Sequence, residues 1–580
     1  MSGFPRLINR TASADALAGL PELPPLLARL YASRGLCTSA ETQLGLDALP
    51  APTMLGLDAA VSALEAAIAS RQRLLIVGDF DCDGATSTSL AILGLKALGA
   101  AEVDFLVPNR FEYGYGLSPE IVAVAAERRP DLIITVDNGI ASIDGVAAAA
   151  SHGIPVIVTD HHLPGDALPD ALAIVNPNQP GCPFPDKSLA GVGVMFYVLL
   201  ALRARLRDSG HFVDRQAPNL AEFLDLVALG TVADVVPLSH ANRILVEQGL
   251  RRIRAGRCRP GISALLRVSG REASRLVASD LGFTVGPRLN AAGRLDDMSI
   301  GIRCLLSESP AEALNLAAEL DDLNRERRSI EQSMKDDAMR ALSHLQLDAS
   351  RVPAGLCLYD PTWHQGVVGI LASRIKEQFH RPVVAFAEVD DGEIKGSARS
   401  IPGLHMRDTL DLVAKRHPKL LSKFGGHAMA AGLSLAKADF DDFKEAFVDA
   451  VAEQLSEEQL EAVVHSDGEL SPAELSLDNA ELLRNAGPWG QAFPAPLFHG
   501  RFSLQQQRIV GERHLKMTLA PLDQPQAIID AIAFNVDTAQ WPDPAVREVE
   551  LVYKLDSNLW RDRLSLQLLV EHLRPVAAAR

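Results

Sequence analysis

Three apolar runs in this sequence are each followed closely by aspartate. The runs Leu74–Val77, Leu132–Val136 and Val156–Thr159 lead into Asp79-Phe80-Asp81-Cys82-Asp83-Gly84, Asp137-Asn138-Gly139 and Asp160-His161-His162. Short β-branched runs separated by helical stretches predict buried parallel strands, and ligands gather at the carboxyl ends of such strands. Carboxylates crowded at one edge of a sheet repel each other unless cations neutralise them. The first hypothesis is therefore a metal-dependent hydrolase.

The first cluster places three carboxylates on alternate residues, Asp79, Asp81 and Asp83. In a strand they would share one face, and in a loop they can surround one ion. An EF-hand begins with a similar spacing, but Leu90 stands at its twelfth position, where that loop needs glutamate, so calcium binding of that kind is excluded. Exposed turn acids are the competing interpretation, and the two further clusters weigh against it.

Other residues refine the chemistry of this site. His161 and His162 bring imidazole among the carboxylates, which shifts the expected metal from magnesium toward manganese or another transition ion. One of these histidines can instead orient the other, or an aspartate. Asp234 interrupts the apolar run Leu229–Val236. A buried acid needs a partner, and a metal is one candidate.

Length and composition describe a multidomain globular protein. A chain of 580 residues is too long for one core, so two to four domains are expected, and 47% hydrophobic with 22% charged residues is ordinary. Six cysteines without C-x-x-C spacing favour reduced thiols over a disulfide or zinc framework. No run reaches the roughly 18 apolar residues of a membrane span. The expected compartment is the cytoplasm.

Charge is unevenly distributed along the chain. The net charge of -17 argues against a protein coated in basic surface. However, Arg251–Arg275 carries eight arginines against one acid, whereas Asp439–Glu481 carries fourteen acids against one base. Local binding of nucleic acid therefore stays open, with a solvated basic helix face as the alternative.

The predicted fold class is α/β, with strands and helices alternating in two separate regions. Between 61 and 305, strands at 73–78, 103–107, 132–136 and 155–159 alternate with helices at 85–98, 118–128 and 141–151, which predicts a parallel sheet. The other predicted parts are a helical leader (1–60), a long connecting helix (306–350), a second α/β module (351–436), an acidic helical spacer (437–486) and a small β-barrel (487–580). Short alternating runs at 515–519, 528–534, 551–555 and 564–569 indicate this module, and by themselves they fit a small barrel or a sandwich.

The motifs of this chain form an ordered series. After the three acid clusters come Gly-Thr-Val-Ala-Asp at 230–234, Gly286-Pro287-Arg288-Leu289-Asn290, His364-Gln365-Gly366, Lys395–Ser400 and Gly425-Gly426-His427. The series resembles the DHH phosphoesterase superfamily and, within it, the RecJ family of bacterial single-strand-specific 5′→3′ exonucleases. The resemblance covers about 40–575. It implies a DHH domain, a DHH-associated domain joined to it by the long helix, and a C-terminal OB-like module.

The resemblance implies a two-metal phosphodiesterase that uses two Mn²⁺ or Mg²⁺ ions. Asp137 would bridge the ions, Asp81 would bind one, and Asp83, His161 and Asp234 the other; His162 joins these acids as a catalytic residue. Many superfamily members have a histidine near the position of Asp79. Two roles for Asp79 therefore stay open: a ligand of the first ion, or a residue that supports the ligands.

The resemblance also implies residues that bind the substrate. These are Arg110, Arg288, Ser397 and Arg399, by analogy with a 5′-phosphate pocket, with Arg294 a weaker candidate. Gly425, Gly426 and His427 precede small residues, which favours a loop whose amides meet phosphate at the start of a helix over a simple turn. Phe111, Tyr113 and Tyr115 could stack on bases, with core packing as the alternative. Gly191-Val192-Gly193 lacks the third glycine of a dinucleotide-binding loop, so helix packing is expected there.

The expected function is degradation of single-stranded DNA from its 5′ end to mononucleotides, in recombination and repair, by a monomer that does not associate with membranes. A single-strand-binding protein and a helicase stay open as partners. One rival is a DHH phosphodiesterase for short oligonucleotides or cyclic dinucleotides, which the additional C-terminal residues argue against. The other is a non-catalytic scaffold that binds single strands, which the complete set of acid motifs argues against.

Overall fold

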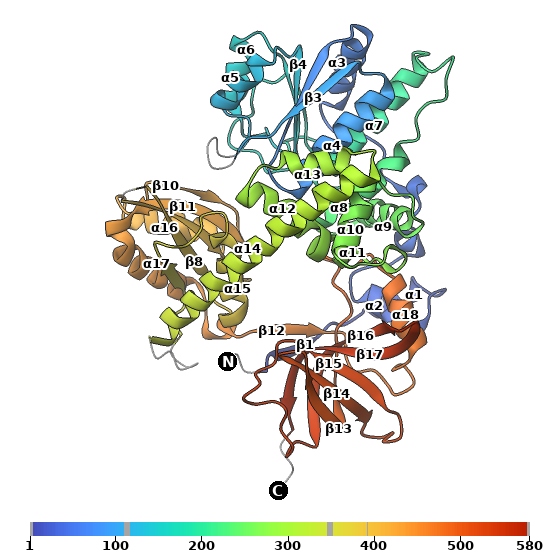
Figure 1. The fold of residues 1–580 in the computed structure, drawn as a ribbon, viewed down its shortest axis with the longest axis vertical. Coiled ribbons are helices and arrows are strands. Elements are labelled where there is room, and N and C mark those ends of the chain that lie inside the picture. The colour runs from blue at the N-terminus through green and yellow to red at the C-terminus, as the bar shows by residue number, and fades with distance from the viewer. Residues whose placement is uncertain (1–3, 110–115, 345–351, 391, 577–580) are drawn as a thin grey trace. The chain divides into compact units, whose positions relative to one another are not determined.

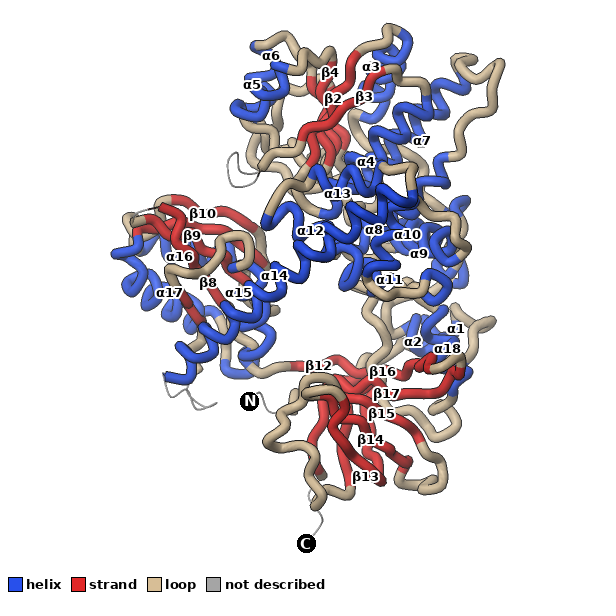
Figure 2. Tube along the Cα trace, in the orientation of Figure 1, coloured by secondary structure: helices blue, strands red, loops and turns tan. Residues whose placement is uncertain are grey.

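The computed structural model describes residues 4–109, 116–344, 352–390 and 392–576. The chain forms two compact units. We call Ala12–Asn324 with Glu481–Ala495 the N-terminal unit, and Met1–Thr11, Arg325–Ala480 and Pro496–Arg580 the C-terminal unit. Figure 1 labels their elements, and Figure 2 separates strands from helices by colour. Within the described residues, no helix is both long and apolar enough to cross a membrane.

The N-terminal unit is built on a five-stranded parallel sheet. Its strands are β2 (Arg73–Gly78), β3 (Glu102–Leu106), β4 (Leu132–Val136), β5 (Val156–Thr159) and β6 (Ala173–Val175), in the order β3-β2-β4-β5-β6. Along β2, Leu74 and Ile76 enter one hydrophobic core and Leu75 and Val77 enter another. The sheet is therefore buried on both faces, which is why its strands read as continuous apolar runs. The four predicted strands are confirmed, and β6 was not predicted.

Helices cover this sheet and extend the unit. They are α1 (Ala14–Ala18), α2 (Pro25–Ala32), α3 (Leu57–Ala69), α4 (Cys82–Leu98), α5 (Pro119–Glu127), α6 (Ile143–Ser151), α7 (Gly191–Asp208), α8 (Leu224–Ala233), α9 (His240–Arg254), α10 (Pro260–Val268), α11 (Ala278–Asp280), α12 (Gly286–Leu295) and α13 (Ser299–Leu306), with a π-helix, η5 (Leu281–Val285), and the 3₁₀ turns η1 (Ser39–Thr42), η2 (Leu46–Ala48), η3 (Leu220–Phe223) and η4 (Ala273–Arg275). Helix α4 begins three residues earlier than predicted because the Asp81 side chain caps it, accepting a hydrogen bond from the Gly84 amide.

A helix of 35 residues, α14 (Pro310–His344), crosses the boundary between the two units. In its first turns, Ala313, Ala317 and Leu320 are buried in the core of the N-terminal unit. The segment contains no proline or glycine after its first residue, as expected for an uninterrupted helix.

The C-terminal unit contains a second, mixed sheet with the strand order β10-β11-β9-β8-β7. Its elements are β7 (Leu356–Tyr359), α15 (Val368–Phe379), β8 (Val383–Asp390), β9 (Glu393–Arg399), α16 (Met406–Arg416), β10 (Lys423–Gly426), β11 (Ala430–Ala436), η7 (Lys437–Asp439), α17 (Phe440–Gln454) and η8 (Glu457–Leu460). Phe443 and Phe447 of α17 are buried in the core of this module. The structure thus differs from the predicted acidic spacer, because the acids of α17 lie around an apolar face that packs against the sheet.

A closed barrel forms the rest of this unit. Its strands are β13 (Phe498–Val510), β14 (His514–Pro521), β15 (Ile529–Ala533), β16 (Glu548–Trp560) and β17 (Arg563–Pro575), in the closed order β13-β14-β15-β17-β16. Each of the four runs that predicted this module coincides with one of its strands, although the run at 528–534 is one residue longer than β15 at each end, and β13 was not predicted. Two further elements are β12 (Val463–Ser466) and α18 (Leu477–Asn485).

Two predicted boundaries differ from the structure. The 1–60 segment is not wholly helical, since β1 (Arg6–Asn9) pairs in parallel with β12 in the C-terminal unit. The barrel does not begin at 487, since Trp489 and Phe493 stack on each other and lie near Tyr31 in the N-terminal unit. Both differences arise from pairing between residues more than 450 positions apart, which local patterns do not encode.

Candidate metal centre

The strand register brings the three acid clusters to one edge of the parallel sheet. Gly78 pairs with Val136 and Val136 with Thr159, so β2, β4 and β5 end side by side. The Asn138 side chain donates to the carbonyls of Val77, at 3.1 Å, and Val136, at 2.9 Å. Asn138 therefore ties the ends of β2 and β4 together and places its neighbour Asp137 between them.

Three groups of side chains at this edge could each hold a metal ion. The groups are Asp79, Asp81 and Asp137; Asp83, His161 and Asp234; and Asp137, His161 and His162. Within each group, one ligand atom from each residue lies within 4.8 Å of the others. All seven predicted residues of the centre thus come together, and Asp137 and His161 each belong to two of the groups. Oxygen-rich sets with one or two imidazoles suit Mn²⁺ and Mg²⁺.

The hydrogen bonding of these side chains fits a metal centre. His161 Nε2 and Asp234 Oδ2 are buried, lie 3.4 Å apart, and make no hydrogen bond to any described residue. Burial lowers the pKa of His161 to about 4, so its imidazole is neutral and available as a ligand. Burial, reinforced by the neighbouring acids, raises the pKa of Asp137 and of Asp234 well above the usual range. A cation is the partner that such a cluster requires.

The start of α7 positions Asp83. The Gly191 amide donates to Asp83 Oδ2 at 2.6 Å and the Val192 amide to Asp83 Oδ1 at 3.0 Å, so the carboxylate is held at a helix N-terminus. Burial and the nearby Asp81 nevertheless raise the pKa of Asp83 to about 7. Gly191 is needed because a Cβ there would lie 2.7 Å from Asp137 Cβ and 2.9 Å from its Cα. Helix packing was predicted for Gly191, but its contact with two acids was not.

Asp160 organises both histidines and is absent from the three metal groups. Its Oδ1 accepts from the amides of His161 and His162 and lies 2.8 Å from His162 Nδ1, while its Oδ2 accepts from the Ile140 amide at 2.9 Å. Burial opposes the charge of His162, but the contact with Asp160 outweighs burial and raises the pKa of His162 to about 9. Asp160 therefore orients the His162 imidazole and holds the backbone of His161, as carboxylates behind metal-binding histidines commonly do.

Helix α12 forms one wall of the centre. Asn290 Oδ1 accepts from the Cys82 amide at 2.7 Å, and a Cβ on Gly293 would lie 1.8 Å from the Phe80 carbonyl oxygen. The motif that contains these residues was recognised in the sequence, but their contact with the acid loop was not. The structure also places Arg288 of this helix inside the protein, where its guanidinium contacts Asp321 Oδ1 at 2.8 Å and the Thr284 carbonyl at 2.6 Å.

The other predicted substrate-binding residues divide into two sets. Arg110, with Phe111, Tyr113 and Tyr115, lies outside the described residues. Ser397, Arg399, Gly425, Gly426 and His427 gather in the C-terminal unit. There Gly432 of β11 pairs with Ser397 of β9 on one side and with Gly425 of β10 on the other. The His427 amide donates to the Ala430 carbonyl in the turn that follows. The segment is thus a hairpin between β10 and β11, and the prediction that a helix begins here is wrong, since Ala430–Ala436 pairs with both neighbouring strands.

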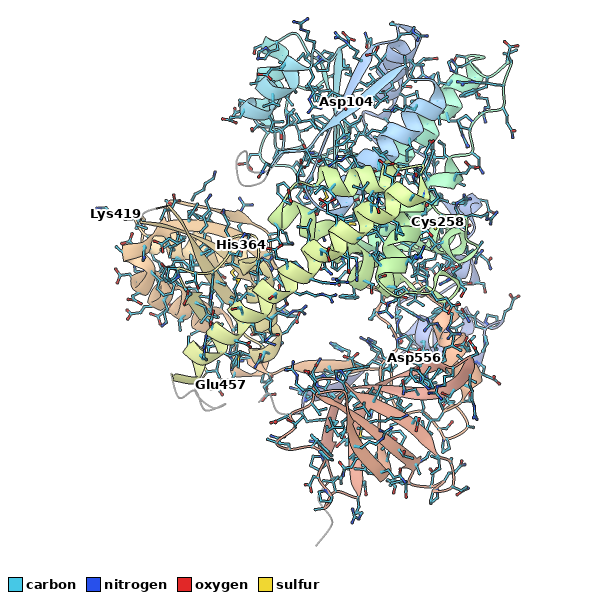
Figure 3. All side chains as sticks on the ribbon, viewed as in Figure 1. Asp104, Cys258, His364, Lys419, Glu457 and Asp556 are labelled. Carbon is cyan, nitrogen blue, oxygen red and sulfur yellow. The ribbon has the colours of Figure 1, made fainter. Side chains whose placement is uncertain are left out.

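These residues surround an open surface next to a positive charge, an arrangement that suits the binding of an anion. No described atom lies within 4 Å of a Cβ built on Gly425 or Gly432, so the surface beside Ser397 is open. The Arg399 guanidinium donates to the Ala398 carbonyl at 2.8 Å, and no carboxylate of a described residue pairs with it. The Arg399 guanidinium lies close to the start of α15, since its Nη2 is 2.8 Å from a Cβ built on Gly369. Burial lowers the pKa of Arg399. In Figure 3, the labelled His364 marks the loop that leads into α15.

Comparisons with known proteins agree with this arrangement. Family models match the DHH family N-terminal domain over 73–231, the DHHA1 domain over 352–457 and the RecJ OB domain over 466–572. The single-stranded-DNA-specific exonuclease RecJ of Dickeya dadantii is 60% identical over 96% of this chain and 97% of its own length. The chain belongs to the RecJ family. The RecJ of Escherichia coli is 58% identical over 98% of this chain and 99% of its own length.

The RecJ fold is also seen in solved structures. The RecJ of Thermus thermophilus in complex with Mn²⁺ has a TM-score of 0.79 and 31% identity, covering 99% of this chain and 80% of that chain. The same protein with Mg²⁺ has a TM-score of 0.74 and 30% identity, covering 99% and 79%. The predicted family and fold class are confirmed, whereas the roles of individual site residues stay predictions.

The crowded carboxylates predict that stabilisation by metal depends on pH. A raised pKa means that the folded, metal-free protein binds a proton more readily than the unfolded chain does. Its stability therefore falls as pH rises from the unfolded value of Asp83 near 4 to its folded value of about 7. Bound Mn²⁺ relieves this repulsion. We expect the rise in Tm on adding Mn²⁺ to EDTA-treated protein to be several degrees larger at pH 8 than at pH 6, since about 1 kcal/mol moves Tm by roughly 2–4 °C in domains of this size.

Differential scanning fluorimetry at both pH values measures this effect. Ca²⁺ at equal concentration controls for ionic strength and for nonspecific binding of divalent ions. A rise in Tm that is the same at pH 6 and pH 8 would show that the acids do not titrate as their burial demands.

Proposed function

We propose that this protein is a metal-dependent, single-stranded-DNA-specific exonuclease that degrades the strand from its 5′ end to mononucleotides, in DNA recombination and repair. The observation that carries the proposal is that Asp137 belongs to two of the three candidate metal groups found among the described residues. Membership of the RecJ family supports the substrate and the reaction. The Mn²⁺ and Mg²⁺ complexes of the Thermus thermophilus relative support either ion as the cofactor.

We assign the site residues to two metal positions. Asp79, Asp81 and Asp137 would hold one ion, and Asp137, Asp83, His161 and Asp234 the other. Asp79 stands in one group with Asp81 and Asp137, which supports it as a ligand, and the Phe80 amide donates to its Oδ1. Two bound ions would supply an activated water and stabilise the leaving oxygen. His162, held by Asp160, would contact the scissile phosphate from beside the acids.

We assign capture of the strand's 5′-phosphate to Ser397, Arg399, Gly425, Gly426 and His427. The Arg399 guanidinium is a half-buried cation that no carboxylate of a described residue neutralises. A phosphate would supply the negative charge that pairs with the Arg399 guanidinium, and it would accept a hydrogen bond from the Ser397 hydroxyl. Arg288 would contribute indirectly by anchoring α12 to α14 through Asp321.

The barrel would bind the single strand. Trp560 is 67% exposed at the β16–β17 turn, with the Arg561 guanidinium 5.8 Å from its ring centroid, and Phe534 is exposed at the end of β15. OB folds bind single strands with such loops and exposed aromatic side chains.

The reaction would call for a helicase that supplies the strand and a single-strand-binding protein that covers it. Free thiols at all six cysteines support the cytoplasm as the compartment.

The two rival functions fit less well. A phosphodiesterase for short oligonucleotides does not require the RecJ OB domain matched over 466–572. A non-catalytic scaffold does not require every acid of the cluster, yet all of them are present and gathered.

Oligonucleotides labelled at either end test the function. With Mn²⁺, a 5′-phosphorylated single strand labelled at the 5′ end should release labelled mononucleotide at once, while the 3′ label is released only at the end. A duplex of the same sequence is the control and should persist. Intact single strands would contradict nuclease activity, and earlier release of the 3′ label would contradict the polarity.

Recognition of the 5′-phosphate predicts a selective defect in the Arg399→Ala variant. A hydrogen bond to a charged group contributes about 1.5–3 kcal/mol, so kcat/KM on 5′-phosphorylated strands should fall about 10- to 100-fold. On 5′-hydroxyl strands the loss should be much smaller. Arg416→Ala is a matched control, because Arg416 lies on the surface of the same module and pairs with Glu453. Equal losses on both substrates would assign Arg399 a structural role.

A further inference from the structure

An exposed phenylalanine lies just before α12, the helix that contacts the acid loop. Phe283 is 80% exposed, although its neighbours Leu281, Thr284 and Val285 are buried. It lies in the π-helix η5, which leads directly into α12. π-Helical turns are rare and are frequently found at functional sites. Because most of the Phe283 ring lies outside the core, the ring is accessible for binding.

The π-helix is held against the end of the helix that supplies Asp234. A Cβ on Gly282 would lie 3.1 Å from Val232 Cγ1, and one on Gly286 would lie 3.1 Å from Ala233 Cβ. These two glycines flank Phe283 and let the backbone of η5 pack closely on α8. The next residue after Ala233 is Asp234, which stands in a metal group. Phe283 is therefore fixed by contacts one and two residues away from a proposed metal ligand.

The residue after Asp234 carries a second sign of function. Val235 has a φ of 63° and is 62% exposed. A β-branched residue in the left-handed region is a strained outlier, and such strain persists mainly at functional sites. Burial of an apolar side chain does not repay the strain here, because the Val235 side chain faces solvent. Exposed apolar groups thus occur on both segments that meet at the Asp234 end of α8.

We propose that Phe283 is a stacking platform for a nucleobase of the strand whose phosphodiester is held at the acid cluster, with Val235 contacting the same nucleotide. This inference rests on the proposed function, since it requires a single strand at the metal centre. A base is the occupant that fits, because unstacked bases leave water by stacking on aromatic rings without regard to sequence. Stacking here would position the strand for cleavage and favour unpaired substrates, whose bases are free to stack.

Single-turnover and steady-state kinetics of the Phe283→Ala and Phe283→Trp variants test the proposal. The substrates are 5′-phosphorylated single strands, either complete or with one abasic site placed in turn at each of the first nucleotides. For Phe283→Ala we expect KM to rise about 5- to 100-fold with a smaller change in kcat, from the energy of stacking one base. Phe283→Trp should retain wild-type KM. Val213→Ala is the matched control, because Val213 is equally exposed, at 82%, beyond the far end of α7.

The abasic series separates stacking from other roles. One abasic position should slow the wild type as much as Phe283→Ala slows cleavage of the complete strand, and the variant should lose nothing further at that position. A Phe283→Ala variant with wild-type KM on free DNA would overturn the proposal, including the case in which Phe283 binds a partner protein. Equal loss at every abasic position would do so too. If the wild type degrades no single strand, the proposed function fails first; if it does and Phe283→Ala behaves identically, only the stacking role fails.

Discussion

The Asp137→Asn variant is expected to have no detectable nuclease activity. Among the described residues, Asp137 is the one acid that belongs to two candidate metal groups. Under the proposed assignment, asparagine in its place should therefore weaken both metal positions together. Without two ions, neither the attacking water nor the leaving oxygen is stabilised. Hydrolysis of a 5′-phosphorylated single strand with Mn²⁺ measures the loss, and fluorescence anisotropy should show that the strand still binds.

The same variant separates chemistry from folding. Asparagine removes one charge from a crowded cluster, so the metal-free variant should be at least as stable as the metal-free wild type. The control is Asp104→Asn, because Asp104 lies on the edge strand β3, pairs with Arg128 at the surface and should tolerate the change (Figure 3). Retained turnover in Asp137→Asn would refute the bridging role.

The Gly191→Ala variant is expected to lose activity about 10- to 100-fold, the range seen when residues that orient metal ligands are changed. A Cβ at Gly191 would lie 2.6 Å from Asp137 Oδ1 and less than 3 Å from the Asp137 backbone, so Asp137 or α7 must move. Movement of α7 would also disturb the amides that hold Asp83. Titration of Mn²⁺ together with kcat/KM measures both effects.

The neighbouring Gly193 supplies the control. A Cβ on Gly193 would meet only the Leu189 side chain, at 3.4 Å or more, which is an ordinary contact. Gly193→Ala should therefore behave like the wild type while sharing the same helix and the same change in helix propensity. Similar activity in the two variants would show that Gly191 is a packing residue, as expected from the sequence alone.

Local sequence patterns predicted the parallel sheet well. Apolar runs at β2, β4 and β5 are buried on both faces, so they read as continuous hydrophobic segments with sharp ends. The acids that follow these runs were expected at one edge of the sheet, because the carboxyl ends of parallel strands meet there. Patterns were weaker where an element is short or pairs over a long distance. β6 has three residues, and β1 finds its partner β12 more than 450 residues away.

The residues of the metal centre also divide into those that the sequence predicted and those that it did not. Asp79, Asp81, Asp83, Asp137, His161, His162 and Asp234 were all predicted, because acids that interrupt apolar runs are conspicuous. Gly191, Val192, Asn290 and Gly293 were not assigned to the centre. Their contributions are made by backbone amides, by one side-chain oxygen and by the absence of a Cβ, and none of these leaves a periodic signal in the sequence.

By itself, the sequence determined the kind of chemistry and the family, because residue types and the order of motifs are local properties. Only the tertiary structure decided how the candidates are used. It placed Asp137 in two metal groups, turned Arg288 inward to Asp321, and brought Ser397 and Gly425 to either side of Gly432 through strand pairing. It also left Phe283 exposed on the π-helix that packs against the end of α8. These outcomes depend on strand register and on close packing between distant segments, which fix side-chain positions to within ångströms.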